Sequence, residues 1–217
     1  MGIKSVIVDG AEALKLMVDG KVAWERCVLP AGYQKCAFLQ SDGNQYLSVD
    51  DYIPQIGDSL SIIFVRHRYY NFGTIFSAGT GEYKITSVFG DPDNRLYMRY
   101  FTNGDAPYKS HVEVREKPYN LRFFSDGKIL FDGTEIDSEV EKSKEPVNTN
   151  LHLFIRANLQ QGFAGKILGF QADRSGETIH NLVPALRSID GKPGMIDTVS
   201  KKFYVNQGTG EFLYELA

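Results

Sequence analysis

Short runs of alternating apolar and polar residues, separated by turn signals, make up most of this chain. In residues 95–100, Leu96, Met98 and Tyr100 share one face of a strand and the polar or aromatic residues between them share the other. Residues 60–65 read as a more fully buried strand, and residues 151–156 and 166–170 are further candidates. Asp-Gly pairs, which favour hairpin turns, stand at 9–10, 19–20, 42–43, 126–127, 132–133 and 190–191. No segment sustains the spacing of a long amphipathic helix, so the pattern predicts an all-β sandwich or jelly roll.

The first residues stand apart from the rest. Val8-Asp9-Gly10 is repeated as Val18-Asp19-Gly20, and Trp24 follows shortly afterwards. This predicts a small β-meander over 1–28 and a main domain over 29–217. Because a lone meander of this size is marginally stable in water, we expect it to pack on the main domain or on a partner. It is either an attachment segment or the first strand pair of the same sandwich.

Composition and charge exclude several classes of protein. The net charge of -3, with acidic and basic residues interspersed, gives no electrostatic footprint for nucleic acid. No stretch approaches the roughly 20 apolar residues that span a bilayer. The N-terminus lacks the apolar core of a signal peptide, which predicts synthesis in a cytoplasm without general secretion. Cys27 and Cys36 are too few for a disulfide framework, although a single bridge between them is open.

A series of short motifs runs along the chain from Leu29-Pro30-Ala31-Gly32-Tyr33 to Gly208-Thr209-Gly210-Glu211-Phe212. Between these two come motifs at 43–46, 71–73, 130–133, 153–154, 165–167, 182–185, 191–194, 195–197 and 202–206. In this order and spacing they resemble the concanavalin A-like (laminin G-like) jelly-roll domain of bacteriophage and prophage tail proteins. The resemblance covers residues 29–217 and identifies an architecture, not a ligand.

The resemblance implies a non-enzymatic virion protein from a tail, baseplate or fibre. Its expected partners are a host cell-surface glycan and other phage tail proteins, and a homo-oligomer is expected from the same setting. The stretch from Val18 to Trp24 is similar to segments that precede the domain in phage tail proteins. A purely structural bacterial surface domain is an alternative, because jelly rolls host lectins, hydrolases and capsid proteins alike.

An acidic segment offers an enzymatic alternative. Glu135, Asp137 and Glu139 resemble the Glu-x-Asp-x-Glu signature of laminarinase-type glycoside hydrolases, and on a strand they point to one face. One acid would serve as nucleophile and another as acid/base in a β-glycan hydrolase. Against this, Ser138 replaces the expected apolar residue and a solvated charge run follows. The favoured interpretation is an exposed hairpin after residues 131–133.

A polar-aromatic patch is the candidate binding site. Tyrosine and arginine dominate binding hot spots, and a tyrosine ring can stack on a sugar while its hydroxyl forms hydrogen bonds. The alternative is a solvent-facing strand end in which arginine and tyrosine pack across strands. The predicted ligand-binding residues are Arg66, Arg68, Tyr69, Tyr70, Tyr97, Arg99, Asn103 and Asp105.

No metal or cofactor is expected to be required. His67, His111, His152 and His180 are scattered and show no ligand spacing. Residues 90–94 carry oxygen ligands that suit Ca²⁺, but Asp-Pro-Asp-Asn is also a common turn sequence, and the turn is favoured.

Overall fold

The computed structural model describes two compact units of the chain, Met1–Ala31 and Gly32–Ala217. Backbone and side chains are described for residues 29–66, 73–79, 116–136, 147–155 and 162–217. Elsewhere only the backbone of short strands is described, within 7–25 and 83–109. All secondary-structure elements in the described residues are β-strands, which confirms the all-β prediction.

The N-terminal unit contains two separate hairpins. β1 (Ile7–Val8) pairs with β2 (Ala11–Glu12), and β3 (Lys15–Val18) pairs with β4 (Lys21–Glu25). Among the described residues β2 and β3 are not paired, so the predicted single meander is two two-stranded sheets. Trp24 lies in β4 opposite Leu16, next to a register shift between Leu16 and Met17.

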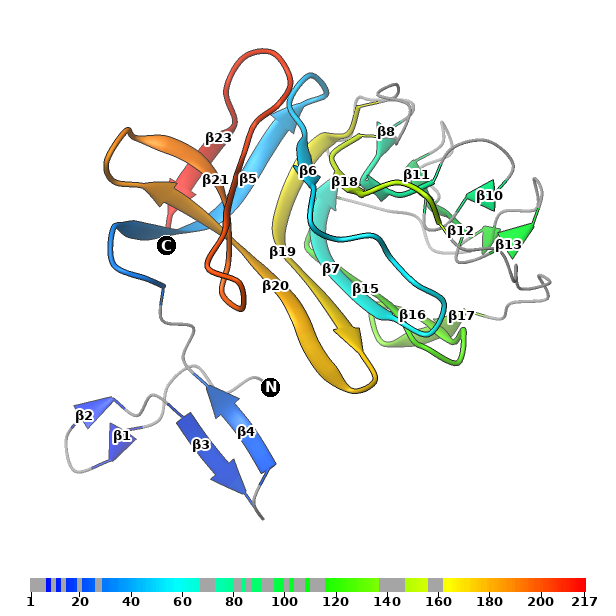
Figure 1. Cartoon of the computed structure of the whole chain (residues 1–217), viewed down its shortest axis with the longest axis horizontal. Helices are drawn as coiled ribbons and strands as arrows, with labels where there is room; N and C mark the ends of the chain where they lie inside the picture. Colours follow the sequence, from blue (N-terminus) through cyan, green and yellow to red (C-terminus); the bar gives the residue numbers. More distant parts are fainter. Residues whose placement is uncertain are drawn as a thin grey trace. The chain divides into compact units, whose positions relative to one another are not determined.

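The main unit is built on a ten-stranded antiparallel sheet, in which β23 pairs with β5 beside the main path. The order along that path is β17 (Thr134–Ile136), β16 (Ile129–Phe131), β15 (Tyr119–Phe123), β7 (Ser59–Arg66), β19 (Ala164–Arg174), β5 (Tyr33–Asp42), β20 (Glu177–Arg187), β21 (Lys192–Asp197) and β22 (Phe203–Val205); β23 spans Leu213–Leu216. Figure 1 shows β19 beside β7 and the long hairpin that β19 forms with β20.

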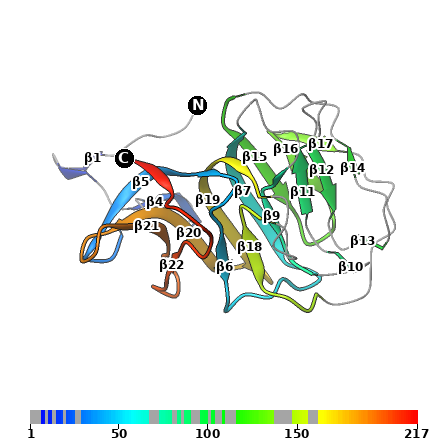
Figure 2. The ribbon, with the colours of Figure 1, turned by 90° about the horizontal axis from the view of Figure 1, so that it is seen from above.

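Smaller sheets complete this unit. β6 (Leu47–Val49), β18 (Leu151–Leu153) and β9 (Phe76–Ser77) form a three-stranded sheet. A four-stranded sheet has the order β14 (Tyr108–Lys109), β12 (Leu96–Arg99), β11 (Ser87–Gly90) and β8 (Gly73–Thr74), and β10 (Tyr83–Lys84) pairs with β13 (Thr102–Asn103). Figure 2 shows these strands from above. The described part of the chain contains no helix long and apolar enough to cross a membrane.

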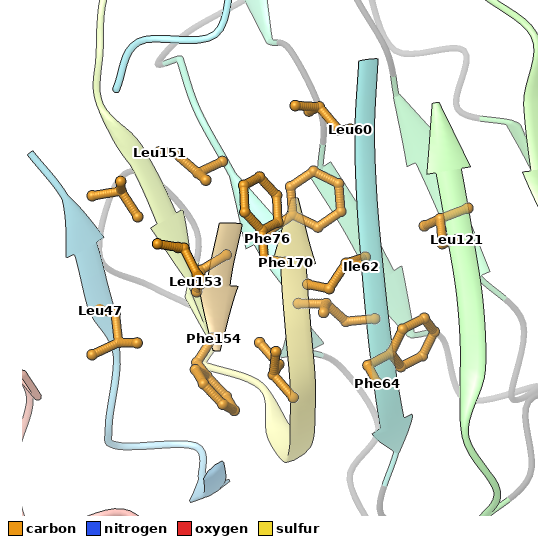
Figure 3. Packing of buried hydrophobic residues seen from close by; sticks show 14 of the residues in the cluster. Leu47, Leu60, Ile62, Phe64, Phe76, Leu121, Leu151, Leu153, Phe154 and Phe170 are labelled. Carbon is orange, nitrogen blue, oxygen red and sulfur yellow. The ribbon is translucent and has the colours of Figure 1, made fainter. Parts of the chain in front are cut away.

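The core lies between the ten-stranded sheet and the β6–β18–β9 sheet (Figure 3). Phe76 of β9 contacts Phe123 and Phe170 of the large sheet, with ring centroids 5.8 and 6.2 Å apart. Phe154, directly after β18, packs on Phe212 at 5.0 Å. Buried aromatic residues supply large apolar area and pack edge-on or tilted, as these pairs do, so they hold the two layers together.

Alternation along the strands decides which side chains enter this core. In β7, Leu60, Ile62 and Phe64 are buried, whereas Ile63 is 38% exposed on the opposite face. The prediction of a more fully buried strand over residues 60–65 holds for one face only, because the other face of β7 is partly exposed. Asp132 and Gly133 both have positive φ (52° and 83°), as a tight hairpin turn between β16 and β17 requires, which confirms that predicted turn.

Cys36 is a free thiol on β5. It is 1% exposed, and burial raises the pKa of its thiol to about 11. Cys27 lies outside the described residues.

We expect Cys36 to be unreactive in the folded protein, because the thiolate is the nucleophile. The raised pKa alone lowers the thiolate fraction at pH 8 roughly 100-fold relative to an ordinary thiol, and burial blocks access further. Labelling a Cys27→Ser variant with a thiol reagent tests this: Cys36 should react only after denaturant is added. Rapid labelling of the folded variant would contradict the buried position.

Candidate functional site

A groove lies on the outer face of the large sheet, the face of β15, β7 and β19 that points away from the core. It has a volume of about 270 Å³. We call it the outer-face groove and define it by three sets of side chains. These are Ser59, Ser61 and Ile63 from β7; Asn120, Arg122 and Phe124 from β15 and the residue after it; and Gln171 and Asp173 from β19.

Strand alternation explains how β7 and β15 place these residues. Tyr119, Leu121 and Phe123 are buried in the core, so Asn120 and Arg122 project outward between them. The register sets Ser61 opposite Arg122 on one side and opposite Gln171 on the other. The three strands therefore present one continuous polar surface.

A β-bulge in β19 decides which of its side chains point to the outer face of the sheet. Ile167 and Phe170 are both buried although they are three residues apart, which simple alternation forbids. The register with β7 shifts between Ile167 and Gly169, so the chain contains one extra residue there, Leu168. Because of this bulge Gln171 and Asp173 point outward, and without it they would point into the core.

The groove has a donor wall, an acceptor wall and a floor of small side chains. On the β15 wall, Arg122 forms no ion pair with a described carboxylate, and its guanidinium lies over the Phe124 ring, 4.9 Å from the centroid. Asn120 accepts a hydrogen bond from Ser61 through Oδ1 (3.3 Å), and its amide N–H groups have no partner among the described residues. The β7 floor is lined by Ser59 and Ser61.

The β19 wall supplies the acceptors. Gln171 donates through Nε2 to Oδ1 of Asp173 (2.8 Å), and Thr178 donates to the same oxygen (2.7 Å). These bonds fix both side chains and leave Gln171 Oε1 and Asp173 Oδ2 without a partner in the described structure. The two walls are two strand spacings apart, about 9.5 Å. With one cation and one anion, the groove has no net charge.

An ion pair holds the acceptor wall in place. Arg174, next to Asp173, binds the buried carboxylate of Asp58 through Nε (2.8 Å) and the terminal Nη2 (2.9 Å). The hydrogen bond with Asp58 raises the pKa of the Arg174 guanidinium above its usual value. Asp58 also accepts from the Tyr52 hydroxyl and the Gln55 N–H, both at 2.9 Å. The start of β7 is thereby tied to the end of β19.

The polar surface extends beyond the groove along one row across six strands. Successive register partners are Glu135, Leu130, Arg122, Ser61, Gln171 and Asn181, from β17 to β20. Register partners share a face of the sheet, so this row spans five strand spacings, about 24 Å. That length suits an extended chain of several sugar rings.

Among the described residues, none of the sequence-predicted binding residues lines this groove. Arg66 ends β7 on the core side and is 5% exposed, unlike the solvent-facing position expected for it. Tyr97 and Arg99 lie in β12 of the four-stranded sheet, and Asn103 lies in β13. Arg68, Tyr69, Tyr70 and Asp105 lie outside the described residues.

The acidic segment is described only at its start. Glu135 is on β17, the last strand of the main path, with its side chain 57% exposed and paired with Lys128 at 2.7 Å. This agrees with the exposed hairpin expected after residues 131–133. Asp137 and Glu139 lie outside the described residues, as do residues 91–94 of the calcium candidate. Within the described residues no group of three or more His, Cys, Asp or Glu side chains is placed to hold a metal ion.

Two of the four histidines can be placed. His180 is buried on β20, and its Nδ1 lies 2.8 Å from Asp197 Oδ2. His152, on β18, is half-buried, and desolvation lowers its pKa. Both sit within the fold, whereas the groove is lined by amides, one guanidinium and one carboxylate.

Comparison with protein-family models and with curated proteins gives no match, whereas comparison with solved structures does. The chain is similar to a putative carbohydrate-binding protein from Bacteroides ovatus, with a TM-score of 0.56 and 12% identity over 84% of this chain and 60% of that one. It is also similar to the native heptameric SAP-like pentraxin from Limulus polyphemus, with a TM-score of 0.51 and 11% identity over 85% and 94% of the two chains. The chain thus spans less than two thirds of the length of the first of these.

At such low identity these similarities show the fold alone. Together with the antiparallel sheets, they establish a concanavalin A-like jelly roll, as the motif series predicted.

Proposed function

We propose that this protein is a non-enzymatic carbohydrate-binding module whose outer-face groove binds a neutral oligosaccharide lying across the strands. The observation that carries the proposal is the pairing of a donor wall, Asn120 and Arg122, with an acceptor wall, Gln171 and Asp173. A sugar hydroxyl is at once a donor and an acceptor, so it can use both walls. The balanced charges of Arg122 and Asp173 favour a neutral ligand over a strongly charged one.

Other features support the same ligand class. Ile63 and Phe124 add apolar surface on which the C–H face of a sugar ring can pack. The guanidinium of Arg122 is held over Phe124, which orients its donors before a ligand arrives. The similarity to a putative carbohydrate-binding protein from Bacteroides ovatus agrees with this function.

Binding without hydrolysis is favoured by the spacing of the carboxylates on this face. Glu135 and Asp173 are four strands apart, about 19 Å, whereas paired catalytic carboxyls stand about 5–9.5 Å apart. A β-glycan hydrolase would have to use Glu135 with Asp137 or Glu139. Release of reducing sugar from laminarin or lichenan, abolished by Glu135→Gln, would favour a β-glycan hydrolase over a binding module.

The proposed biological setting of the module is a bacteriophage virion. The motif series over residues 29–217 supports a place in a bacteriophage tail, baseplate or fibre, where the module would bind a host-surface glycan or join other tail proteins. Homo-oligomerisation in that setting stays a prediction.

A glycan array followed by titration of the best neutral oligosaccharide tests the binding site. Arg122→Ala and Gln171→Ala should each weaken binding about 10- to 100-fold, because each removes hydrogen bonds with a charged or fixed polar group. Arg187→Ala is the matched control, since Arg187 also lies over an aromatic ring, that of Phe203 at 5.0 Å, but outside the groove. Absence of binding to every neutral glycan, or an equal loss in the control, would contradict the proposal.

A further inference from the structure

A second, smaller pocket lies between the start of β21 and the loop that leads to β23. Its volume is about 190 Å³, room for about six water molecules at roughly 30 Å³ each. Its lining includes Lys192, Pro193, Val205, Asn206, Glu211 and Phe212. None of these residues lines the outer-face groove, so the two sites can be tested separately.

The loop that forms one side of this pocket is fixed by its own hydrogen bonds. Asn206 accepts through Oδ1 from the N–H groups of Tyr46 (3.1 Å) and Gly208 (2.9 Å) and donates through Nδ2 to the Gly210 carbonyl (2.8 Å). A Cβ at Gly208 would lie 1.9 Å from the Asn44 carbonyl oxygen, so only glycine fits this close approach. The pocket is therefore a preformed part of the fold.

Two opposite charges, Lys192 and Glu211, line the pocket, and neither side chain forms a close ion pair in the described structure. Lys192 lies near enough to Asp190 to help lower the pKa of that carboxyl. The side chains of Lys192 and Glu211 are exposed and form no ion pair or hydrogen bond with a described residue. Neighbouring charges behave differently: Arg187 pairs with Asp190 at 2.6 Å, and Lys202 pairs with Asp50 and Asp51. The lining also includes the apolar residues Pro193 and Phe212, which are buried in the fold, and Val205.

We infer that this pocket binds a small zwitterion, a ligand of amino-acid size with one carboxylate and one ammonium group joined by a short apolar body. Lys192 pairs with the carboxylate and Glu211 with the ammonium, while Pro193, Val205 and Phe212 contact the body between them. A ligand with a single charge would satisfy only one of the two side chains. This inference does not depend on the proposed function of the outer-face groove.

Titration with the ω-amino acids from glycine to 6-aminohexanoate, followed by NMR of the full chain, tests the site. We expect saturable shifts around residues 192 and 206–212, with one optimal chain length that binds more tightly than the matched fatty acid and the matched alkylamine. Lys192→Met and Glu211→Gln should each weaken this binding about two- to fivefold, the range for exposed charge pairs. Lys35→Met, which removes an exposed lysine outside the pocket, should leave it unchanged.

The double variant Lys192→Glu with Glu211→Lys gives the sharpest check. Both charges are kept in exchanged positions, so a zwitterion binds in the reversed direction and affinity should return to within about twofold of the original protein. The inference is overturned if no amino acid binds more tightly than the singly charged analogues, or if the single variants bind like the original protein.

Discussion

Replacing Asp197 by alanine is expected to lower the free energy of unfolding by about 3–5 kcal/mol, the usual cost of breaking a buried charged network. For a domain of this size that corresponds to a fall in melting temperature of roughly 10 °C. Asp197 is the last residue of β21 and is fully buried. Thermal and urea denaturation of the purified variant measure the effect.

Four hydrogen bonds explain why one side chain matters this much. Oδ1 of Asp197 accepts from the backbone N–H groups of Asn181 (3.0 Å) and Val199 (2.9 Å). Oδ2 accepts from the Ser200 hydroxyl (2.8 Å) and lies 2.8 Å from Nδ1 of His180. The carboxylate thus joins β20, the end of β21 and the turn before β22. Alanine would leave the buried His180 and the partly buried donors of Asn181, Val199 and Ser200, from β20 and the turn before β22, without this acceptor, which costs desolvation energy.

The same network predicts how stability changes with acid. Burial by itself raises the pKa of Asp197, but the hydrogen bonds from His180, Asn181, Val199 and Ser200 outweigh it and lower the pKa well below its usual value. A lowered folded-state pKa contributes stability above the unfolded value near 3.9, and this contribution is lost as the pH falls through the folded pKa. The difference between the original protein and Asp197→Ala should therefore shrink by about 1.4 kcal/mol for each pH unit below about 3.9.

Asp190→Ala is the matched control for this experiment. Asp190 is an aspartate in the turn before β21, and its hydrogen bond with Arg187 lowers its pKa to about 2. Its side chain is on the surface, where solvent screens the pair, so the melting temperature should change little. An equal loss of stability in both variants would show that the buried network around Asp197 has no special role.

Local patterns predicted the strands and turns of this fold because those features depend on neighbouring residues. Asp132-Gly133 forms the expected turn since both positions need positive φ, and residues 96–99 and 151–153 form strands within the segments expected to be strands. The groove was not predicted, because its residues come from strands near 60, 120 and 171, and no single sequence specifies which strands become neighbours.

Two further features of the strands depend on the three-dimensional structure. The bulge at Leu168 reverses the faces of Gln171 and Asp173, and within residues 166–170 Gly169 is the sign of it, because a glycine inside a strand often marks a bulge. Arg66 shares the core face of β7 with Leu60, Ile62 and Phe64, although its charge suggests solvent. The arginine that does face the outer-face groove, Arg122, is indicated in the sequence by its alternation with Leu121 and Phe123.

Substituting Gly169 by a larger residue should weaken oligosaccharide binding without lowering the stability of the fold. Gly169 lies opposite Ile63 in the register, beside the outer-face groove and directly before Phe170, which points into the core. A Cβ added there would meet nothing nearer than the Leu182 carbonyl oxygen at 3.8 Å, an ordinary contact. The free energy of unfolding should therefore stay the same or rise by about 0.5–1 kcal/mol, since a glycine inside a strand destabilises the folded state relative to alanine or valine.

Binding should follow the opposite trend, because any side chain at this position projects onto the surface where the oligosaccharide would lie. Gly169→Ala adds one methyl group and should bind nearly as well as the original protein, whereas Gly169→Val should bind more weakly and Gly169→Phe at least tenfold more weakly, a loss of about 1.4 kcal/mol. Denaturation and glycan titration on the same three preparations measure both quantities. A folded Gly169→Phe variant that binds the oligosaccharide with unchanged affinity would place the ligand elsewhere on the molecule, because a bulky ring and a sugar chain cannot occupy the same outer face of β19.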